Sequence, residues 1–375
     1  MLRRSFTPAL LLILAATPVT QADIVHRETS EVGPVVVEEL ATGLGVPWGM
    51  EFLDEEQLLI TERAGRVQVL DLGSRALREV TGLPSIRQGG QGGLLDVAST
   101  EKAPGWYYFT RVGSVENRGV TILSRARLQG DRLTGWEDLL VTRSGTGSGR
   151  HFGSRIAFDG DGHVYFSTGD RGERPNGQNL QTHAGTIMRL TLDGQVPPDN
   201  PFIGKAGALP EIWSYGHRNP QGLAYDAGHD RLWENEHGPR GGDEINLIQR
   251  GANYGWAELS YGKEYWGPID VGEGEEAPGM VSPVKVYIPS IAPGSLLHYT
   301  GDAFPQWRDN LFSGALALRH LNRVSLDESG NAVAEERLLE EMDERIRALE
   351  QGPDGAIYLS TDSGRILRLK PASGE

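Results

Sequence analysis

The chain has 375 residues, 50 of them glycine and none of them cysteine, and its formal net charge is −15 at pH 7. Such an acidic surface disfavours nucleic acid and anionic membranes as partners, whereas a neutral small molecule or a cation meets no such barrier. Without cysteine the fold cannot use disulfides, although a chain of this length can bury enough apolar surface to do without them.

The first 22 residues have the features of a secretory signal peptide. Two arginines near the start precede a short apolar run over 8–16, and small residues at Thr20 and Ala22 predict cleavage after Ala22. The run is shorter than the roughly 20 residues that a membrane span needs. We therefore expect a soluble secreted or periplasmic protein with a single domain over 23–375.

Six segments along the chain share a pattern of two strands joined by a turn. It is clearest where Asp-Gly separates alternating apolar and polar residues, because both positions of such a turn favour positive φ. In chain order the segments are 48–72, 93–112, 155–170, 222–236, 310–326 and 348–363.

Repeated units of roughly 40–50 residues, each a small antiparallel sheet, predict a β-propeller. A small antiparallel sheet cannot bury both of its faces alone, and radial stacking of such sheets covers them. We predict an all-β fold, a six-bladed β-propeller of four-stranded antiparallel sheets around a central channel. A β-sandwich followed by a separate domain is the alternative, and the lack of a predicted amphipathic helix argues against an α/β fold.

Three segments depart from the strand pattern and carry candidate functional residues. They cover 149–155, 215–223 and 235–246, and each lies where a loop meets a predicted strand. In a propeller such positions face the mouth of the channel.

These segments, together with 253–256 and 304–307, resemble the soluble quinoprotein glucose dehydrogenase family, and within it the aldose sugar dehydrogenase branch. The resemblance runs from Gly45 to Leu369, and its longest motifs span 216–222 and 236–246. It implies pyrroloquinoline quinone (PQQ) and Ca²⁺ as cofactors. It also implies oxidation of an aldose at C1 to the lactone, with electrons passed to an external acceptor. For the oligomeric state we expect a monomer or weak dimer.

The resemblance assigns catalytic roles to His151 and Arg218. His151 would take the proton from the anomeric hydroxyl, a task that suits imidazole near neutral pH. Arg218 would stabilise negative charge that develops on the quinone oxygen, and Asn219 would donate a hydrogen bond nearby. The alternatives are a loop histidine bonded to backbone and an arginine paired with a surface carboxylate.

Four further residues are expected to bind the quinone. Gln91 resembles a glutamine that contacts it, and Arg345 and Arg347 resemble a pair that grips its carboxylates, with surface salt bridges as the alternative. Residues two apart on a strand share a face, and guanidinium groups bind carboxylates bidentately. Ala317 replaces a family lysine, and Arg319, two residues on in the expected strand, is the candidate substitute.

Two sets of residues are expected to bind calcium. The backbone carbonyls of Gly238 and Pro239 would hold the cofactor's ion, since Ca²⁺ prefers oxygen ligands. Glu244 and Tyr254 resemble ligands of a structural ion, whose other family ligands fall in 257–265, where the sequence diverges. The number of structural ions is therefore left open.

Other departures from the family bear on the substrate. Glucose-specific members have an acidic residue before the catalytic histidine, where this chain has Arg150, and the stretch around 287–290 is shortened. Their sugar preference therefore does not carry over to this chain.

Two other functions are compatible with a propeller. One is a calcium-dependent hydrolase of the lactonase type, and the other is a non-catalytic propeller that binds glycans. The arginine pair and the Gly-Pro site favour an anionic organic cofactor over both, because fold alone does not decide function.

Overall fold

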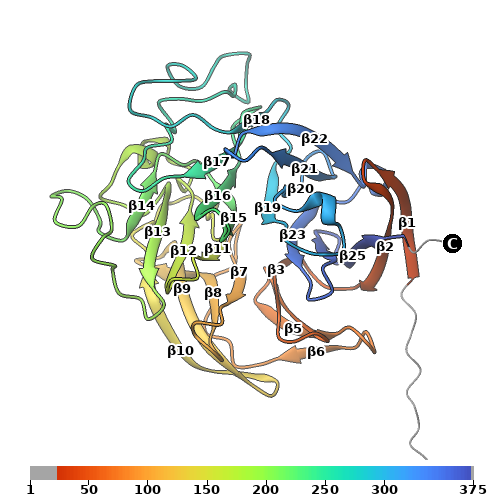
Figure 1. The fold of residues 1–375 in the computed structure, drawn as a ribbon. Coiled ribbons are helices and arrows are strands. Elements are labelled where there is room, and N and C mark those ends of the chain that lie inside the picture. The colour runs from red at the N-terminus through yellow and green to blue at the C-terminus, as the bar shows by residue number, and fades with distance from the viewer. Residues whose placement is uncertain (1–22, 373–375) are drawn as a thin grey trace, which may run out of the picture.

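The computed structural model describes residues 23–372, so the predicted signal peptide lies outside the described residues. This part of the chain forms six antiparallel sheets arranged in a ring (Figure 1). The predicted six-bladed β-propeller is therefore confirmed.

The first three blades follow one another along the chain. The first contains β3 (Pro47–Phe52), β4 (Gln57–Glu62), β5 (Arg66–Asp71) and β6 (Leu77–Val80). The second contains β7 (Leu94–Ser99), β8 (Tyr107–Val115), β9 (Arg118–Gln129) and β10 (Arg132–Val141). The third contains β11 (Ile156–Phe158), β12 (His163–Thr168), β13 (Thr186–Thr191) and β14 (Ile212–Tyr215).

The other three blades complete the ring. The fourth contains β15 (Pro220–Asp226), β16 (Arg231–Glu236), β17 (Asp243–Ile248) and β18 (Lys285–Tyr287). The fifth contains β19 (Pro293–His298), β20 (Leu311–Ala315), β21 (Leu321–Leu326) and β22 (Ala332–Leu338). The sixth contains β23 (Ile346–Gln351), β24 (Ile357–Thr361), β25 (Ile366–Pro371), β2 (Gly33–Ala41) and β1 (Asp23–Ser30).

The sixth blade joins the two ends of the described chain. β2 pairs antiparallel with β25, with Val37 opposite Leu369, and β1 then pairs with β2 as a fifth strand. The other five blades have the predicted four strands. Because β2 comes from the start of the chain and β25 from its end, their pairing closes the ring.

The innermost strands surround the channel. β3, β7, β11, β15, β19 and β23 are the first strands of their blades, and each contacts the inner strand of the next blade around the ring. The ends of these strands therefore bring residues far apart in sequence to the channel axis.

The core consists of apolar layers between neighbouring blades. Between the fourth and fifth blades, for example, Trp233 and Ile245 pack against Leu311 and Val324, all at most 1% exposed. Five similar layers fill the other interfaces. Burial of this apolar surface is the main force that holds the blades together.

Two details differ from the sequence prediction. In the Asp-Gly turns only the glycines, Gly160, Gly162 and Gly355, have positive φ, because these loops are longer than two residues. The segment 310–326 contains the second and third strands of its blade, and the inner strand β19 precedes it.

The helical segments of residues 23–372 are three short 3₁₀ turns. They span Arg174–Gln178, Pro305–Trp307 and Glu340–Met342. Within the described range, no helix has the length and apolar character required to cross a membrane.

Candidate active site

A cavity of about 320 Å³ lies on the channel axis, at the ends where the inner strands begin. Each blade contributes a residue at or just before the start of its inner strand. In order around the ring these are Trp48, Leu95, Gly153, Gln221, Ala292 and Arg347. Gln91, Asn219 and Arg345, three of the predicted cofactor ligands, line the same cavity.

Three guanidinium groups make one side of this cavity cationic. Arg345 and Arg347 both contact Asp362, with Arg345 Nε 2.9 Å from Oδ2 and Arg347 Nε 2.9 Å from Oδ1. Burial opposes ionisation of Asp362, but the two arginines outweigh it and lower the pKa of the carboxyl. Arg63 lines the cavity as well, and the sequence analysis did not single it out. The wall therefore carries three positive charges against one negative charge.

Arg319 lies away from this wall. The expected strand position is wrong, because β20 ends at Ala315 and Arg319 follows in a turn with φ of 51°. Its Nη1 is 2.7 Å from Asp343 Oδ2, in an exposed ion pair. Arg319 does not line the cavity, whereas its predicted companions Arg345 and Arg347 do.

His151 lies next to the cavity without lining it, and is only 8% exposed. Its backbone N–H donates to Gln91 Oε1 at 2.6 Å, and the next two residues, Phe152 and Gly153, line the cavity. Burial lowers the pKa of His151; Asp170 opposes this shift, while the positive charges of Arg218 and Arg150 add to it. The ring is therefore neutral at pH 7.

Asp170 fixes the orientation of the His151 ring. Its Oδ1 lies 2.6 Å from His151 Nδ1, and its Oδ2 accepts a hydrogen bond of 2.7 Å from Trp256 Nε1. An ionised Asp170 requires the proton on Nδ1, which leaves the lone pair on Nε2. In the sequence, Asp170 is the last residue of the repeat 155–170 and was not predicted as a site residue. Its position two residues after β12, beside the mouth of the channel, was the available signal.

Glu236 positions the turn that carries Arg218 and Asn219. Its Oε2 accepts the backbone N–H groups of both residues, at 2.5 and 3.1 Å. Arg218 Nη1 donates to the carbonyl of His237 at 2.9 Å, and the guanidinium lies 5.3 Å from the centroid of the Trp256 ring. Asn219 is buried, with Oδ1 accepting from Gly153 N–H at 3.3 Å. Glu236 begins the motif 236–246 but was not predicted as a site residue, because it acts by accepting the backbone N–H groups of a turn 17 and 18 residues away in sequence.

The Gly238-Pro239 turn is held by Asp243 and Ser290. Asp243 Oδ1 accepts the N–H of Gly238 at 2.8 Å, and Ser290 Oγ donates to the carbonyl of Pro239 at 3.3 Å. A side chain at Gly238 would bring its Cβ within 2.0 Å of the carbonyl oxygen of Gly242, so only glycine fits this approach.

A small pocket beside this turn contains the second predicted calcium set. Glu244 and Tyr254 line it together with Gly238, Pro239 and Arg218. Burial and the neighbouring carboxylate of Glu236 raise the pKa of Glu244. The structure thus brings the four predicted metal ligands to one side of the Arg218 turn.

A buried ion pair separates the cavity from the opposite end of the channel. Arg155 Nη1 lies 2.6 Å from Asp96 Oδ1, and the same guanidinium donates to the carbonyls of Gln221 and Gly294. A second cavity of about 350 Å³, lined in part by Asp96 and Glu350, lies beyond it. The Arg155–Asp96 pair therefore closes the cavity beside His151 on the side that faces the rest of the channel.

Comparisons with known proteins find relatives that match most of the chain. The aldose sugar dehydrogenase YliI of Escherichia coli (strain K12) is 39% identical over 348 residues, which cover 90% of this chain and 93% of that protein. The crystal structure of the soluble aldose sugar dehydrogenase from Escherichia coli, in the apo-form, has a TM-score of 0.85 at 37% identity, over 90% of this chain and 100% of the other. The PQQ-bound form of aldose sugar dehydrogenase from Streptomyces coelicolor has a TM-score of 0.72 at 27% identity, over 95% and 99% of the two chains.

The family comparison covers most of the described chain. Residues 44–368 match Glucose / Sorbosone dehydrogenase, nearly the range over which the motifs suggested a resemblance. That resemblance is confirmed, and the chain belongs to the glucose/sorbosone dehydrogenase family.

Proposed function

We propose that the protein oxidises aldoses at C1 to lactones with PQQ and Ca²⁺, and passes the electrons to an external acceptor. The observation that supports this most is one cavity with three arginines on one side and the His151–Asp170 pair next to it. With residues 1–22 as a signal peptide, the reaction would take place outside the cytoplasm.

The cavity suits a flat polycarboxylate. Arg63, Arg345 and Arg347 offer guanidinium groups to carboxylates, and Gln91 and Asn219 add neutral polar groups. Trp48 and Phe152 add aromatic surface against which a planar ring can pack. Arg319 would have to leave Asp343 to take part, so its role as a substitute for the family lysine is the least supported of the ligand assignments.

The proton of the sugar would go to His151. As O1 loses its proton to Nε2, the C1–O1 bond gains double-bond character and the C1–H bond breaks with its electron pair. PQQ, if held in the cavity by Arg63, Arg345 and Arg347, would supply the acceptor for that hydride. His151 is suited to this task because it is neutral at pH 7 and its free nitrogen is fixed by Asp170.

Arg218 would stabilise the negative charge that develops on the quinone oxygen. Its guanidinium is held by the His237 carbonyl and its backbone by Glu236, so little reorganisation is needed when charge appears. Asn219, fixed in the same turn, would provide a second donor.

The carbonyls of Gly238 and Pro239 would hold the cofactor's Ca²⁺ beside Arg218. Glu244 and Tyr254 would hold a structural Ca²⁺ in the pocket next to this turn. Asp243 and Ser290 fix the Gly-Pro turn, which keeps its carbonyls in place for the ion. A metal bound there would polarise the quinone as a Lewis acid.

The sugar would enter beside an exposed aromatic loop. Tyr265 and Trp266 are 64% and 74% exposed, and the Tyr265 hydroxyl lies 3.4 Å from Arg218 Nη2. Two ion pairs, Arg174–Glu264 and Lys263–Asp270, hold this loop. An aromatic face at this position would pack on the C–H face of a pyranose.

One assay tests the whole proposal. Chelator-treated protein is supplied with Ca²⁺ and PQQ, and reduction of an artificial dye is followed with several aldoses. We expect dye reduction that requires sugar, PQQ and Ca²⁺ together. Demonstrated PQQ binding without sugar-dependent dye reduction would refute the proposal, and a His151→Ala variant with normal turnover would refute the base assignment.

A further inference from the structure

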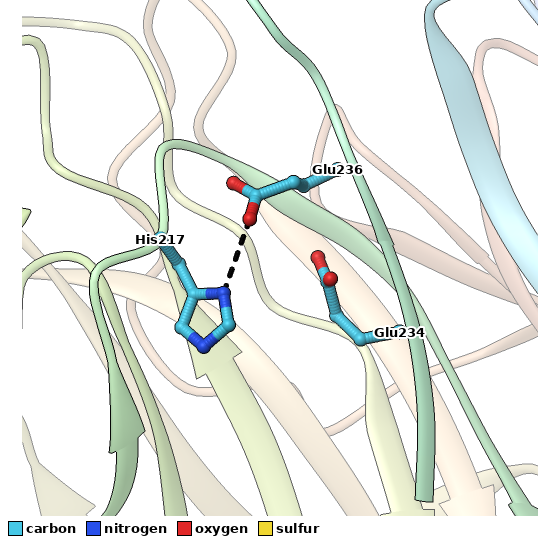
Figure 2. Close-up of side chains that lie close together, drawn as sticks. All are labelled: His217, Glu234 and Glu236. Atoms are coloured by element: carbon cyan, nitrogen blue, oxygen red, sulfur yellow. Dashed lines mark hydrogen bonds and ion pairs between the residues drawn. The ribbon is translucent and has the colours of Figure 1, made fainter. Parts of the chain in front are cut away.

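A second group of ionisable side chains lies next to the turn that carries Arg218 and Asn219. Its three members are drawn in Figure 2. His217 belongs to that turn, and Glu234 and Glu236 lie two residues apart on β16, so their side chains share a face. The potential ligand atoms of the three residues all lie within 4.8 Å of one another. Figure 2 shows the two carboxylates and the imidazole gathered around a common space.

The negative charge of this group is not balanced by the protein around it. Glu234 and His217 are fully buried and Glu236 is 4% exposed. Among the described residues, no lysine or arginine forms an ion pair with either glutamate; Glu236 pairs only with His217, at 3.1 Å. A buried carboxylate without a counter-charge is strongly unfavourable.

Two acceptor atoms in the group also lack a hydrogen-bond donor. Glu234 Oε2 accepts from Asn246 Nδ2 at 3.0 Å, but Glu234 Oε1 and Asn246 Oδ1 are both buried without a partner. Buried polar atoms are nearly always satisfied in native proteins, so an unsatisfied carboxylate oxygen beside a second carboxylate indicates a missing positive group.

We propose that His217, Glu234 and Glu236 bind a divalent cation of the kind that accepts both imidazole and carboxylate ligands, Mn²⁺ or Zn²⁺. One nitrogen and two carboxylate oxygens are typical donors for these ions, whereas Ca²⁺ takes oxygen ligands only. None of the three proposed ligands belongs to either proposed calcium site, although Glu236 also lines the pocket of Glu244 and Tyr254, and the inference does not rest on the proposed sugar oxidation.

The surroundings of His217 suit a metal ligand. Nε2 lies 2.9 Å from Ser214 Oγ, so an Nε2–H that donates to this hydroxyl leaves the lone pair of Nδ1 directed toward the carboxylates. Metal-bound histidines are commonly fixed in this way by their second nitrogen. The ring of Tyr254 stacks on His217 with centroids 4.8 Å apart and planes at 22°.

The cation would connect to the active site through Glu236. Oε1 of this residue faces His217, while Oε2 holds the backbone N–H groups of Arg218 and Asn219. A metal on Oε1 would fix the carboxylate and with it the turn that presents Arg218. The cation therefore has a positioning role in this site.

The test uses full-length, chelator-treated protein with saturating Ca²⁺, to which Mn²⁺ or Zn²⁺ is added separately. Bound metal per chain is measured by elemental analysis, and the thermal midpoint by calorimetry. We expect one equivalent of Mn²⁺ or Zn²⁺ that Ca²⁺ does not displace, and a rise of several degrees in the midpoint. Glu234→Gln should weaken this binding at least tenfold and abolish the rise.

Glu350→Gln is the matched control. Burial and nearby carboxylates raise the pKa of Glu350 as they do that of Glu234, but Glu350 lies at the opposite end of the channel. This variant should bind the metal as wild type does. Co²⁺ serves as a spectroscopic probe, and His217→Gln should remove the imidazole contribution to its visible bands. This second readout remains available if Glu234→Gln does not fold.

Three results would overturn the inference. One is the absence of any bound Mn²⁺ or Zn²⁺, with Glu234→Gln more heat-stable than wild type whether or not metal is present; a proton would then neutralise the cluster. Another is displacement of the metal by Ca²⁺. The third is equal metal binding by wild type and Glu234→Gln, with Co²⁺ bands that do not respond to His217→Gln.

Discussion

The carboxylate of Asp170 holds the ring of His151 by Nδ1, with 2.6 Å between Oδ1 and the nitrogen. A similar pair, His163 and Asp159, lies at the other end of β12 with Nδ1 and Oδ2 2.7 Å apart, away from the cavity. A His–Asp pair of similar geometry therefore lies at each end of β12. The pair beside the cavity is the candidate for catalysis, and the pair away from it serves as the control.

Asp170→Asn should lower kcat by about 10²-fold or more, since general-base catalysis contributes on the order of 10²–10⁴-fold and depends on the correct tautomer. An amide can turn its NH₂ toward Nδ1, which moves the ring proton to Nε2 and removes the base. Dye-reduction kinetics measure the loss, and Asp159→Asn should keep wild-type turnover. Equal effects of the two substitutions would contradict the role of Asp170.

The pH dependence of kcat/KM should have an acid limb below the ordinary histidine pKa of about 6.5. Burial lowers the pKa of His151, so the neutral base persists as the pH falls through 6.5 and is lost only when it passes the lowered value. Asp170 raises this pKa against the effect of burial. In Asp170→Asn the acid limb should therefore move to still lower pH, and a shift to higher pH would contradict this electrostatic account.

The strand and turn pattern was sufficient to predict the fold, and the family motifs were sufficient to predict Gln91, Asn219, Arg345 and Arg347 in the cavity wall. Arg347 lies on β23 and Arg345 directly before it, and the motif around Arg218 is long, so placing them needed no knowledge of packing. Asp170, Glu236 and Asp362 were missed, since each acts by contacting a residue from a segment distant in sequence. Arg319 was misplaced because a strand was assumed where the chain turns.

Arg347→Gln should weaken PQQ binding about 10- to 100-fold, since a hydrogen bond to a charged group contributes about 1.5–3 kcal/mol. Arg347 is 7% exposed and donates twice to Asp362, so its guanidinium is already oriented in the cavity wall. Titration of the apoprotein with PQQ measures the change. Arg368→Gln is the control, because Arg368 lies on β25 of the same blade and pairs with Glu38 outside the cavity. Unchanged affinity in Arg347→Gln would remove this residue from the proposed site.

Gly238→Ala should abolish the Ca²⁺ dependence of PQQ binding and lower the free energy of unfolding by about 1–3 kcal/mol. The added Cβ would lie 2.0 Å from the Gly242 carbonyl oxygen, so the turn must shift and its carbonyls move away from the ion. Calorimetry and Ca²⁺ titration in the presence of PQQ check the two effects. Gly73→Ala, whose Cβ would meet Asp71 Oδ1 at an ordinary 3.6 Å, should change neither. If Gly238→Ala kept calcium-dependent binding, the backbone carbonyls would not be the ligands.

Trp266→Ala should raise KM for aldoses about three- to tenfold and leave kcat unchanged, as expected for an aromatic contact of about 0.5–1.5 kcal/mol. Trp266 is 74% exposed on the loop that places Tyr265 beside Arg218, so its removal costs little packing. PQQ affinity should stay at the wild-type value, because Trp266 does not line the cavity. Val333→Ala, another exposed apolar side chain, on the outer strand β22, is the control and should leave KM unchanged. A fall in kcat at constant KM would mean that Trp266 supports Arg218 and does not contact the sugar.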